Sequence, residues 1–461
     1  MSVPTLLKSV QGKLCRVLRP HHVLGSFSFP SRGKTKFHKP LDPHHKEELP
    51  EFEYVGARST PDRLVFTWGV ADHGGLGRAS FVRPDHSKGQ HHMAYVHHPH
   101  RLEFGEYHDV IDIGCGYGFT MFAVHKKSQY TCFGTGINTD SQIGGHEPRQ
   151  GSPLGMLINP APLHVALKGS AVHKVSCGRA HTVMLTDTGK VWTVGCNSYG
   201  QCGRPIIPDE DYGRTPVYHN LQAIPDPTIT QIECGQDTSF FLGESGCVYS
   251  CGWGADGQTG RGHYNNEPSV GPVVGDIVGE KIIKVSCRAD CVLAINDKGD
   301  VFGWGNSEYG QLNSVTDEMQ LHTSRRLKFP GMKKVVDVAS GGTMCLVLDE
   351  DGQVFSWGFG PIGKGPEVTH SKDPTPIPST LFGCNEITPE AKAISVNSGV
   401  NHFAVINNFG SLFTWGKNPG GCLGQGHSND HYFPLRVAIA GQVLKVSCGV
   451  DHTAALVKEI I

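Results

Sequence analysis

The stretch VSCGRAHTVMLTDTGKVWTVGCNSYGQCG, residues 175–203, decides the fold because variants of it recur along the chain. Each copy reads as an apolar strand, a short loop, a second apolar strand, a tight turn, a third strand and a glycine-rich loop. Long helical patterns are absent. The sequence therefore predicts an all-β fold built from repeats. The further copies begin at Ile113 (a degenerate copy), Ile232, Val285, Val338 and Val396.

Glycine accounts for 59 of the 461 residues, and its positions follow the repeat. A hairpin turn needs a residue at positive φ, which glycine adopts without strain. Five of the six copies have such a turn glycine: Gly189, Gly246, Gly299, Gly352 and Gly410. Each third strand also ends on glycine: Gly69, Gly136, Gly195, Gly252, Gly305, Gly358 and Gly416. All six tryptophans are expected at the ends of third strands.

A seventh unit is divided between the two ends of the chain. The C-terminal LKVSCGVDHTAALVKEII supplies two strands, and RLVFTWGVADHGGLG, residues 63–77, supplies a third strand and its glycine loop. Joining them closes a ring that leaves no long unpaired sheet edge. We therefore predict a seven-bladed β-propeller over residues 51–461. The longest inserts between units, expected to carry partner-specific surface, are 78–109, 145–170, 204–228 and 365–392.

Residues 1–50 are predicted to be a mitochondrial transit peptide and disordered leader. Residues 1–41 contain eight Lys or Arg and no acid, with apolar and basic residues at roughly helical spacing near the start. A disordered basic tail that binds nucleic acid or serves nuclear import is the alternative. The other 33 of the 41 basic residues face 43 acids, a net charge of −10 for the rest of the chain. That charge repels phosphate, so we expect contact with RNA to be indirect.

Other compositional features exclude several classes of protein. No apolar run reaches the roughly 18 residues of a membrane span. The 15 cysteines include no C-x-x-C pair and follow no secretory signal, which indicates reduced, mostly buried thiols. Histidine clusters, including the segment 89–104, lack the Cys or carboxylate partners of a metal site and are read as solvated loops.

Three glycine motifs imitate cofactor loops. VYSCGWGADGQTG, residues 248–260, contains the dinucleotide spacing G-x-G-x-x-G, but Pro268 and Pro272 follow instead of a helix. VIDIGCGYG, residues 110–118, resembles a methyltransferase loop but continues into the repeat's next strands. GFGPIGK, residues 358–364, lacks the Ser or Thr and the helix of a phosphate loop. We expect no cofactor, no metal and no catalytic residues, and hence no enzyme of covalent chemistry.

The repeat pattern CG-x-x-H-T, apolar strand, G-x-V-W-x-x-G, then N-x-x-G-Q-x-G resembles the regulator of chromosome condensation repeat family. The resemblance covers residues 64–461. When the basic leader is also considered, the chain most resembles the mitochondrial branch of this family. It implies a propeller in the mitochondrial matrix, or on the matrix face of the inner membrane with peripheral association. Two functions follow from it as expectations. One is a scaffold for large-subunit ribosomal RNA maturation and ribosome assembly, with RNA-modifying and ribosome-assembly proteins as partners. The alternative is a guanine-nucleotide exchange factor for the inner-membrane dynamin-related fusion GTPase.

The loops between first and second strands carry the candidate partner contacts. In the family's founder, Asp and His residues of these loops face the bound GTPase. The matching residues here are His181, Asp237, Asp290, His402, Asp451 and His452. The regular recurrence of the three histidines also fits a structural role at the start of a strand. The chain departs from the repeat at Arg288 (for Gly), Cys291 (for His), Ser340 and Met344 (for Cys and His) and Ser398 (for Cys).

Overall fold

The computed structural model describes residues 63–78, 94–146, 155–167, 169–222 and 224–459. These residues lie in one compact unit, Arg58–Ile461. It is formed by seven sheets of four antiparallel strands each, which confirms the predicted seven-bladed propeller. The leader and its predicted boundary at residue 50 lie outside the described residues, as do His91 and His92. In the described part of the chain, no helix is long and apolar enough to cross a membrane.

The blades are numbered here from the closing sheet. Blade 1 contains β27 (Gln442–Cys448), β28 (His452–Lys458), β1 (Arg63–Val70) and β2 (Tyr95–Arg101); blade 2 contains β3 (Val110–Cys115), β4 (Phe119–Val124), β5 (Cys132–Ile137) and β6 (Met156–Pro162). Blade 3 contains β7 (Val172–Cys177), β8 (His181–Thr186), β9 (Val191–Gly195) and β10 (His219–Leu221); blade 4 contains β11 (Ile229–Cys234), β12 (Thr238–Gly243), β13 (Val248–Gly252) and β14 (Glu267–Pro272). Blade 5 contains β15 (Ile282–Cys287), β16 (Cys291–Asn296), β17 (Val301–Asn306) and β18 (Gln320–Arg326); blade 6 contains β19 (Val335–Ser340), β20 (Met344–Asp349), β21 (Val354–Phe359) and β22 (His370–Pro376). Blade 7 contains β23 (Ala393–Ser398), β24 (His402–Asn407), β25 (Leu412–Gly416) and β26 (His431–Arg436), and the short helices are α1 (Phe104–Tyr107), η1 (Ser379–Phe382) and η2 (Pro419–Gly421).

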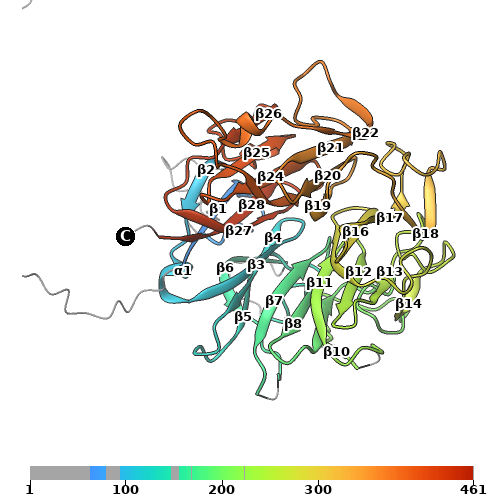
Figure 1. The fold of residues 1–461 in the computed structure, drawn as a ribbon. Coiled ribbons are helices and arrows are strands. Elements are labelled where there is room, and N and C mark those ends of the chain that lie inside the picture. Colours follow the sequence, from blue (N-terminus) through green and yellow to red (C-terminus); the bar gives the residue numbers. More distant parts are fainter. Residues whose placement is uncertain (1–62, 79–93, 147–154, 168, 223, 460–461) are drawn as a thin grey trace, which may run out of the picture. The chain divides into compact units, whose positions relative to one another are not determined.

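Blade 1 closes the ring as predicted. Strand β1 pairs antiparallel with β28 in a continuous register from Arg63↔Lys458 to Gly69↔His452. Figure 1 shows the blue β1 beside the red β28 and β27. Because β1 also pairs with β2, the two ends of the chain are held in the same four-stranded sheet.

Each blade has a fourth strand that the repeat pattern did not reveal. In blades 1, 2, 3 and 6 this outer strand lies inside one of the long inserts. The outer strands are polar and half-exposed, so they carry little of the alternation that marks a strand in sequence. The inserts are therefore partly sheet, and only their remaining loops are free to form additional surface.

The glycines at the end of each third strand permit close approach between neighbouring strands. Their φ angles run from 89° to 122°, and a Cβ at Gly252 would collide with the carbonyl oxygen of Asp237. The turn glycines Gly189 to Gly410 have φ between 74° and 90°, as a hairpin requires. The stretch 248–260 is thus β13 and its following loop, which leads into the strand β14. The other two glycine motifs also belong to blades. Residues 110–118 form β3 and its following loop, residues 358–364 begin at the end of β21, and both motifs lead into further strands.

Four tryptophans precede a third-strand glycine and are fully buried between blades: Trp68, Trp304, Trp357 and Trp415. Trp304 Nε1 donates to the Gln258 carbonyl at 2.9 Å, and Trp357 Nε1 donates to the Gln311 carbonyl at 2.7 Å. Each bond joins a blade to the glycine loop of the blade before it. Trp192 and Trp253 stand out of this register and are only half-buried, a departure from the expectation that all six are equivalent.

The first strand of each blade lines the central cavity and is bonded to its neighbour by side chains. Asp112 Oδ2 accepts from Val175 N at 2.9 Å, and Asp337 Oδ2 accepts from Val396 N at 3.0 Å. A second bond of this kind starts two positions beyond the one that corresponds to Asp112: on β7, Ser176 Oγ accepts from Cys234 N at 3.0 Å. These bonds satisfy backbone groups at the inner sheet edges, which no strand covers.

The cysteines of the described residues are all free thiols, as predicted. They are buried with three exceptions, Cys196 and Cys384 (half-buried) and Cys247 (exposed). Most therefore fill the apolar space between blades.

Candidate functional site

The six predicted contact residues lie on one face of the ring. First and third strands run in the same direction, so the loops after both emerge together; we call this the loop face. Asp237, Asp290 and Asp451 end the loops between first and second strands. His181, His402 and His452 are the first residues of β8, β24 and β28. The structure therefore groups the six by face but distributes them over several blades.

The three histidines are buried and connect neighbouring blades. Each Nε2 reaches a hydroxyl group on the second strand of the next blade, and each ring is at most 1 % exposed. The pairs are His181 with Ser239 at 2.9 Å, His402 with Thr453 at 3.2 Å and His452 with Thr120 at 2.9 Å. A partner on the loop face would meet these rings only through the loops that cover them, so direct contact stays a prediction.

The hydrogen bonds around His181 require only one proton on its ring, so the imidazole is neutral. The Ser239 hydroxyl donates its proton to the Gln201 carbonyl at 2.8 Å, so its oxygen accepts from His181 Nε2. Nδ1 is buried, has no hydrogen-bond partner among the described residues and needs no proton. Burial, assisted by the charge of Arg179, lowers the pKa of His181 to about 3. His402 is similar: burial, then the charges of His452 and Arg288, lower its pKa to about 4.

His452 is charged, although it occupies the same repeat position. The Thr120 hydroxyl donates to the Gly75 carbonyl at 2.8 Å and therefore accepts from His452 Nε2. Nδ1 faces Asp451 Oδ1 at 3.2 Å, and a carboxylate can only accept. Both ring nitrogens thus carry protons. Burial opposes the charge, but the Cys115 thiol and the Asp451 carboxylate raise the pKa of His452 to about 10.

Asp451 is held by two imidazoles. His73 Nε2 lies 3.4 Å from Asp451 Oδ2, whereas His452 contacts Oδ1. Burial alone would raise the pKa of Asp451, but the hydrogen bonds from His452 and His73 lower it. The same hydrogen bond raises the pKa of His73. His73 was not among the predicted residues, because it lies in a glycine loop more than 370 positions away in sequence.

Asp237 is held by an arginine and a glutamine. Arg179 Nη2 lies 2.6 Å from Asp237 Oδ2, and Gln201 Nε2 donates to Oδ1 at 3.3 Å. Burial still raises the pKa of Asp237 against the lowering effect of Arg179. The arginine side chain is 48 % exposed, so the pair presents a cation beside a buried carboxylate.

Among the residues that the structure describes, no cationic side chain lies within ion-pair distance of Asp290. Gln258 Nε2 donates to Asp290 Oδ1 at 3.0 Å. Burial, reinforced by the charges of Asp256 and Asp237, raises the pKa of Asp290 to about 6. This carboxyl would gain stabilisation from a cation supplied by a partner.

The glutamines were missed by the sequence reasoning, although the motif N-x-x-G-Q-x-G contained them. Gln201, Gln258 and Gln311 each donate to the first-to-second strand loop of the next blade. Each also accepts through Oε1 from a backbone N–H of its own loop. Their recurrence at one motif position was the available signal.

Aromatic pairs lie beside these polar groups on the loop face. Tyr199 and Trp253 form an edge-to-face pair with centroids 4.4 Å apart. Tyr309 and Phe359 stack at 5.9 Å and are 40 % and 49 % exposed. Partly exposed aromatic residues of this kind supply much of the binding free energy at protein interfaces.

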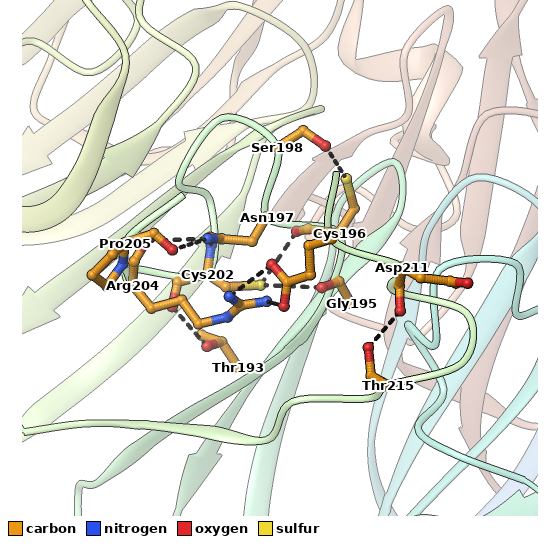
Figure 2. Close-up of polar contacts among 11 residues, drawn as sticks. Thr193, Gly195, Cys196, Asn197, Ser198, Cys202, Arg204, Pro205, Asp211 and Thr215 are labelled. Carbon is orange, nitrogen blue, oxygen red and sulfur yellow. Dashed lines mark hydrogen bonds and ion pairs between the residues drawn. The ribbon is translucent and has the colours of Figure 1, made fainter. Parts of the chain in front are cut away.

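The insert that follows β9 is fixed by buried polar contacts, which Figure 2 shows. Asn197 Nδ2 donates to the carbonyls of Arg204 (3.1 Å) and Pro205 (3.2 Å). The Arg204 guanidinium forms two bonds to Glu210, at 2.9 and 2.7 Å, and both side chains are under 10 % exposed. This part of the loop face is therefore ordered before any partner binds.

A cavity of about 540 Å³ runs along the axis of the ring and is lined by all seven first strands. At its loop-face end Arg288 replaces the repeat glycine, and its Nε donates to the Ser398 carbonyl of blade 7 at 3.1 Å. Glu233 also lines the cavity; burial raises its pKa against the lowering charge of Arg288.

One histidine of the predicted solvated segment pairs with a loop group of blade 7. His97 lies 2.9 Å from Ser428 Oγ, and nearby His427 and His431 have Nε2 atoms 3.3 Å apart. Across the part of the chain that the structure describes, no three His, Cys, Asp or Glu side chains gather as metal ligands.

Comparison with known proteins confirms the resemblance read from the repeats. The model of the regulator of chromosome condensation (RCC1) repeat matches residues 64–123, 188–242, 245–295, 298–348 and 410–456. A second model of this repeat matches residues 172–201 and 229–258. The "RCC1-like G exchanging factor-like protein" of Mus musculus is 44 % identical over 426 residues, covering 90 % of this chain and 91 % of the relative. The human protein of that name is 44 % identical over 424 residues, with the same coverage of both chains.

Solved structures agree with the fold. The crystal structure of human WBSCR16 superposes with a TM-score of 0.81 at 44 % identity, covering 87 % of this chain and all of that one. Prp20p from Saccharomyces cerevisiae superposes with a TM-score of 0.70 at 19 % identity, covering 87 % of this chain and 92 % of the other, which supports the fold alone.

Proposed function

Because the chain belongs to the regulator of chromosome condensation repeat family, we propose that it is a mitochondrial scaffold for ribosome assembly. It would support large-subunit ribosomal RNA maturation by binding RNA-modifying and assembly proteins. The loop face carries this proposal. Its first-to-second and third-to-fourth strand loops present carboxylates on most blades, interleaved with the exposed aromatic pairs. These carboxylates are Asp72, Asp140, Asp237, Asp256, Asp290, Glu308 and Asp451.

The charge of this face favours basic protein segments over RNA. Carboxylates attract lysine and arginine side chains and repel a phosphate backbone. The raised pKa of Asp290 marks one position where a partner's cation would be stabilising. Contact with ribosomal RNA would then be made by the bound proteins.

Crosslinking tests the adapter role. Ultraviolet crosslinking of the protein in mitochondria should recover protein adducts at the loop face and little RNA. A substitution of Asp290→Lys should reduce those protein adducts, whereas Asp351→Lys, on the opposite face, should leave them unchanged. Abundant direct adducts to ribosomal RNA would contradict the adapter role.

Proximity labelling tests the location and the neighbours together. The full-length protein should label ribosome-assembly proteins of the mitochondrial matrix. Removal of residues 1–45 should abolish that labelling if the leader is a transit peptide. If the protein without residues 1–45 labels the same mitochondrial proteins, the leader is not a transit peptide. If the full-length protein labels nuclear proteins instead, the alternative of a nuclear import tail is supported.

Exchange activity toward the inner-membrane dynamin-related fusion GTPase is the second candidate. Two observations favour it: the relatives' name contains "G exchanging factor", and carboxylates occupy the loop positions that face the GTPase in the family's founder. An exchange factor must bind the nucleotide-free GTPase more tightly than the loaded form. Purified protein should then accelerate GDP release from that GTPase, and Asp290→Lys should abolish the acceleration. Release at the uncatalysed rate would contradict this candidate.

A further inference from the structure

A β-bulge recurs near the start of every first strand, at the second residue or, in β27, at the third, on the face opposite the loop face. The pairing register passes over one residue in each blade, and that residue has no partner on the second strand. A bulge turns its extra side chain away from the ladder. The bulged residues are Ile111, His173, Thr230, Ile283, Val336, Ile394 and Leu444.

Five consecutive blades place an apolar residue on this bulge. Ile283, Val336, Ile394 and Leu444 are between 42 % and 53 % exposed, and Ile111 holds the same position in blade 2, where it is half-buried and packs against the apolar core. The first strands of these blades contact one another in the same order, so the five side chains form a row, which we call the bulge arc. Single exposed aliphatic residues are ordinary, whereas a contiguous row of them marks an interaction surface.

The arc borders the mouth of the axial cavity, and cationic side chains lie just inside it. Lys284 and Lys445 directly follow the arc residues Ile283 and Leu444, and Lys174 holds the same position in blade 3; all three line the cavity. Lys445 pairs with Asp112, and Lys284 pairs with Asp337. Lys174 Nζ instead donates to the Thr230 carbonyl at 2.9 Å.

The charge balance of the cavity favours an anionic group. With Arg288, the lining has four cationic side chains, opposed by the carboxylates of Asp112, Glu233 and Asp337. This one-charge excess occurs in a chain whose residues outside the leader carry net negative charge. The mouth thus combines an apolar rim with a cationic interior.

We propose that this mouth binds an extended peptide segment of a partner protein, with apolar side chains on the bulge arc and a carboxylate inside the cavity. The carboxylate belongs to an Asp or Glu side chain or to a chain terminus, and Lys174 is its expected partner. The apolar arc argues for peptide rather than nucleic acid, which would use the lysines and leave the aliphatic side chains without apolar contact. The site lies opposite the loop face, so it does not depend on the proposed function.

A peptide selection tests this inference. The full-length protein is screened against a displayed library of random nonapeptides with free C-termini, and enriched peptides are measured by fluorescence anisotropy. Enrichment of peptides that combine Leu, Ile or Phe with Asp, Glu or a free carboxyl terminus is expected. Ile394→Asp and Leu444→Asp should each weaken binding at least tenfold. Val278→Asp, which alters a still more exposed apolar residue outside the arc, should change binding less than twofold.

The contact between Lys174 and the peptide carboxylate is tested separately from the apolar contacts. Lys174→Glu should weaken binding of the carboxylate peptide but not of its Asn, Gln or amidated counterpart. Thermal melting checks that each variant is folded, and Ile394→Ser replaces Ile394→Asp if the latter unfolds. No enrichment, or binding unaffected by the arc variants, would overturn the inference. Binding of a polyuridine RNA that is lost in Lys174→Glu but retained in Ile394→Asp would also overturn it, in favour of a nucleic-acid site.

Discussion

His452 donates Nδ1–H to the Asp451 carboxylate across 3.2 Å, in the blade that joins the two ends of the chain. The imidazolium also bonds to Thr120 of blade 2, so this ion pair supports the closure of the ring on both sides. Neither His181 nor His402 has a carboxylate at this position, because Ala180 and Asn401 precede them. The Asp451 carboxylate, together with Cys115, therefore distinguishes the charge of His452 from that of the other two histidines.

Asp451→Asn should destabilise the protein by about 3 kcal/mol at neutral pH, because it leaves a buried imidazolium without its partner. The pKa of His452 is raised from its ordinary value to about 10 by folding. Its stabilisation is therefore complete below pH 6.5 and lost as the pH rises toward 10. Denaturant unfolding at pH 6.5 and 9.5 should show that loss in the wild type and a smaller one in the variant. If the free energy of unfolding changes equally with pH in the two proteins, the ion pair does not have this role.

His181 predicts the opposite pH dependence. Its pKa is lowered to about 3 in the folded protein, so the unfolded chain binds a proton first as the pH falls below 6.5. Stability then decreases with falling pH by about 1.4 kcal/mol per pH unit for this group. In His181→Asn the dependence between pH 6.5 and 4.5 should be shallower by about that amount. The same pH dependence in His181→Asn and in the wild type would contradict this assignment.

Trp304 and Trp415 form a matched pair for the inter-blade hydrogen bond. Both indoles are buried at the same repeat position, but Trp304 Nε1 donates to the Gln258 carbonyl, whereas Trp415 Nε1 has no partner in the described part of the chain. Substitution by Phe removes similar volume from each. Trp304→Phe should therefore cost about 1–3 kcal/mol more than Trp415→Phe in urea unfolding, because it leaves the Gln258 carbonyl unsatisfied. Equal losses would show that packing alone determines the effect.

The blades could be predicted from the sequence because the pattern that marks them is local. Strand alternation, turn glycines and the third-strand glycine recur within each unit, and the ring closure followed from the incomplete units at the two ends. The outer strands were missed because short polar strands such as β10 have no apolar alternation. The contacts of the candidate site could be predicted less well. The pairing of His452 with Thr120 and of Asp451 with His73 joins residues more than 330 positions apart, and only the closed ring brings them together.

The insert after β9 should lose its order when its buried ion pair is broken. Glu210→Gln removes the charge that Arg204 binds through two hydrogen bonds, and a buried unpaired guanidinium costs about 3–5 kcal/mol. Limited proteolysis should then cleave within residues 204–218 at least tenfold faster. Asp211→Asn, which breaks the exposed pair with Arg214, should change the rate less than twofold. Equal cleavage rates in Glu210→Gln and the wild type would contradict this assignment.

Cys291 and Cys345 replace the histidine and hydroxyl that join other blades. Cys291 opens β16 as His181 opens β8, and Cys345 stands second in β20 as Ser239 does in β12. Both thiols are fully buried, and after burial the interaction with Cys291 also raises the pKa of the Cys345 thiol. Cys291→His alone should overpack this junction and cost about 1–3 kcal/mol. Adding Cys345→Ser supplies the hydroxyl that the new imidazole can donate to, so the double variant should recover at least 1 kcal/mol relative to additivity in a double-mutant cycle. Strictly additive losses would show that the two positions do not form a coupled pair.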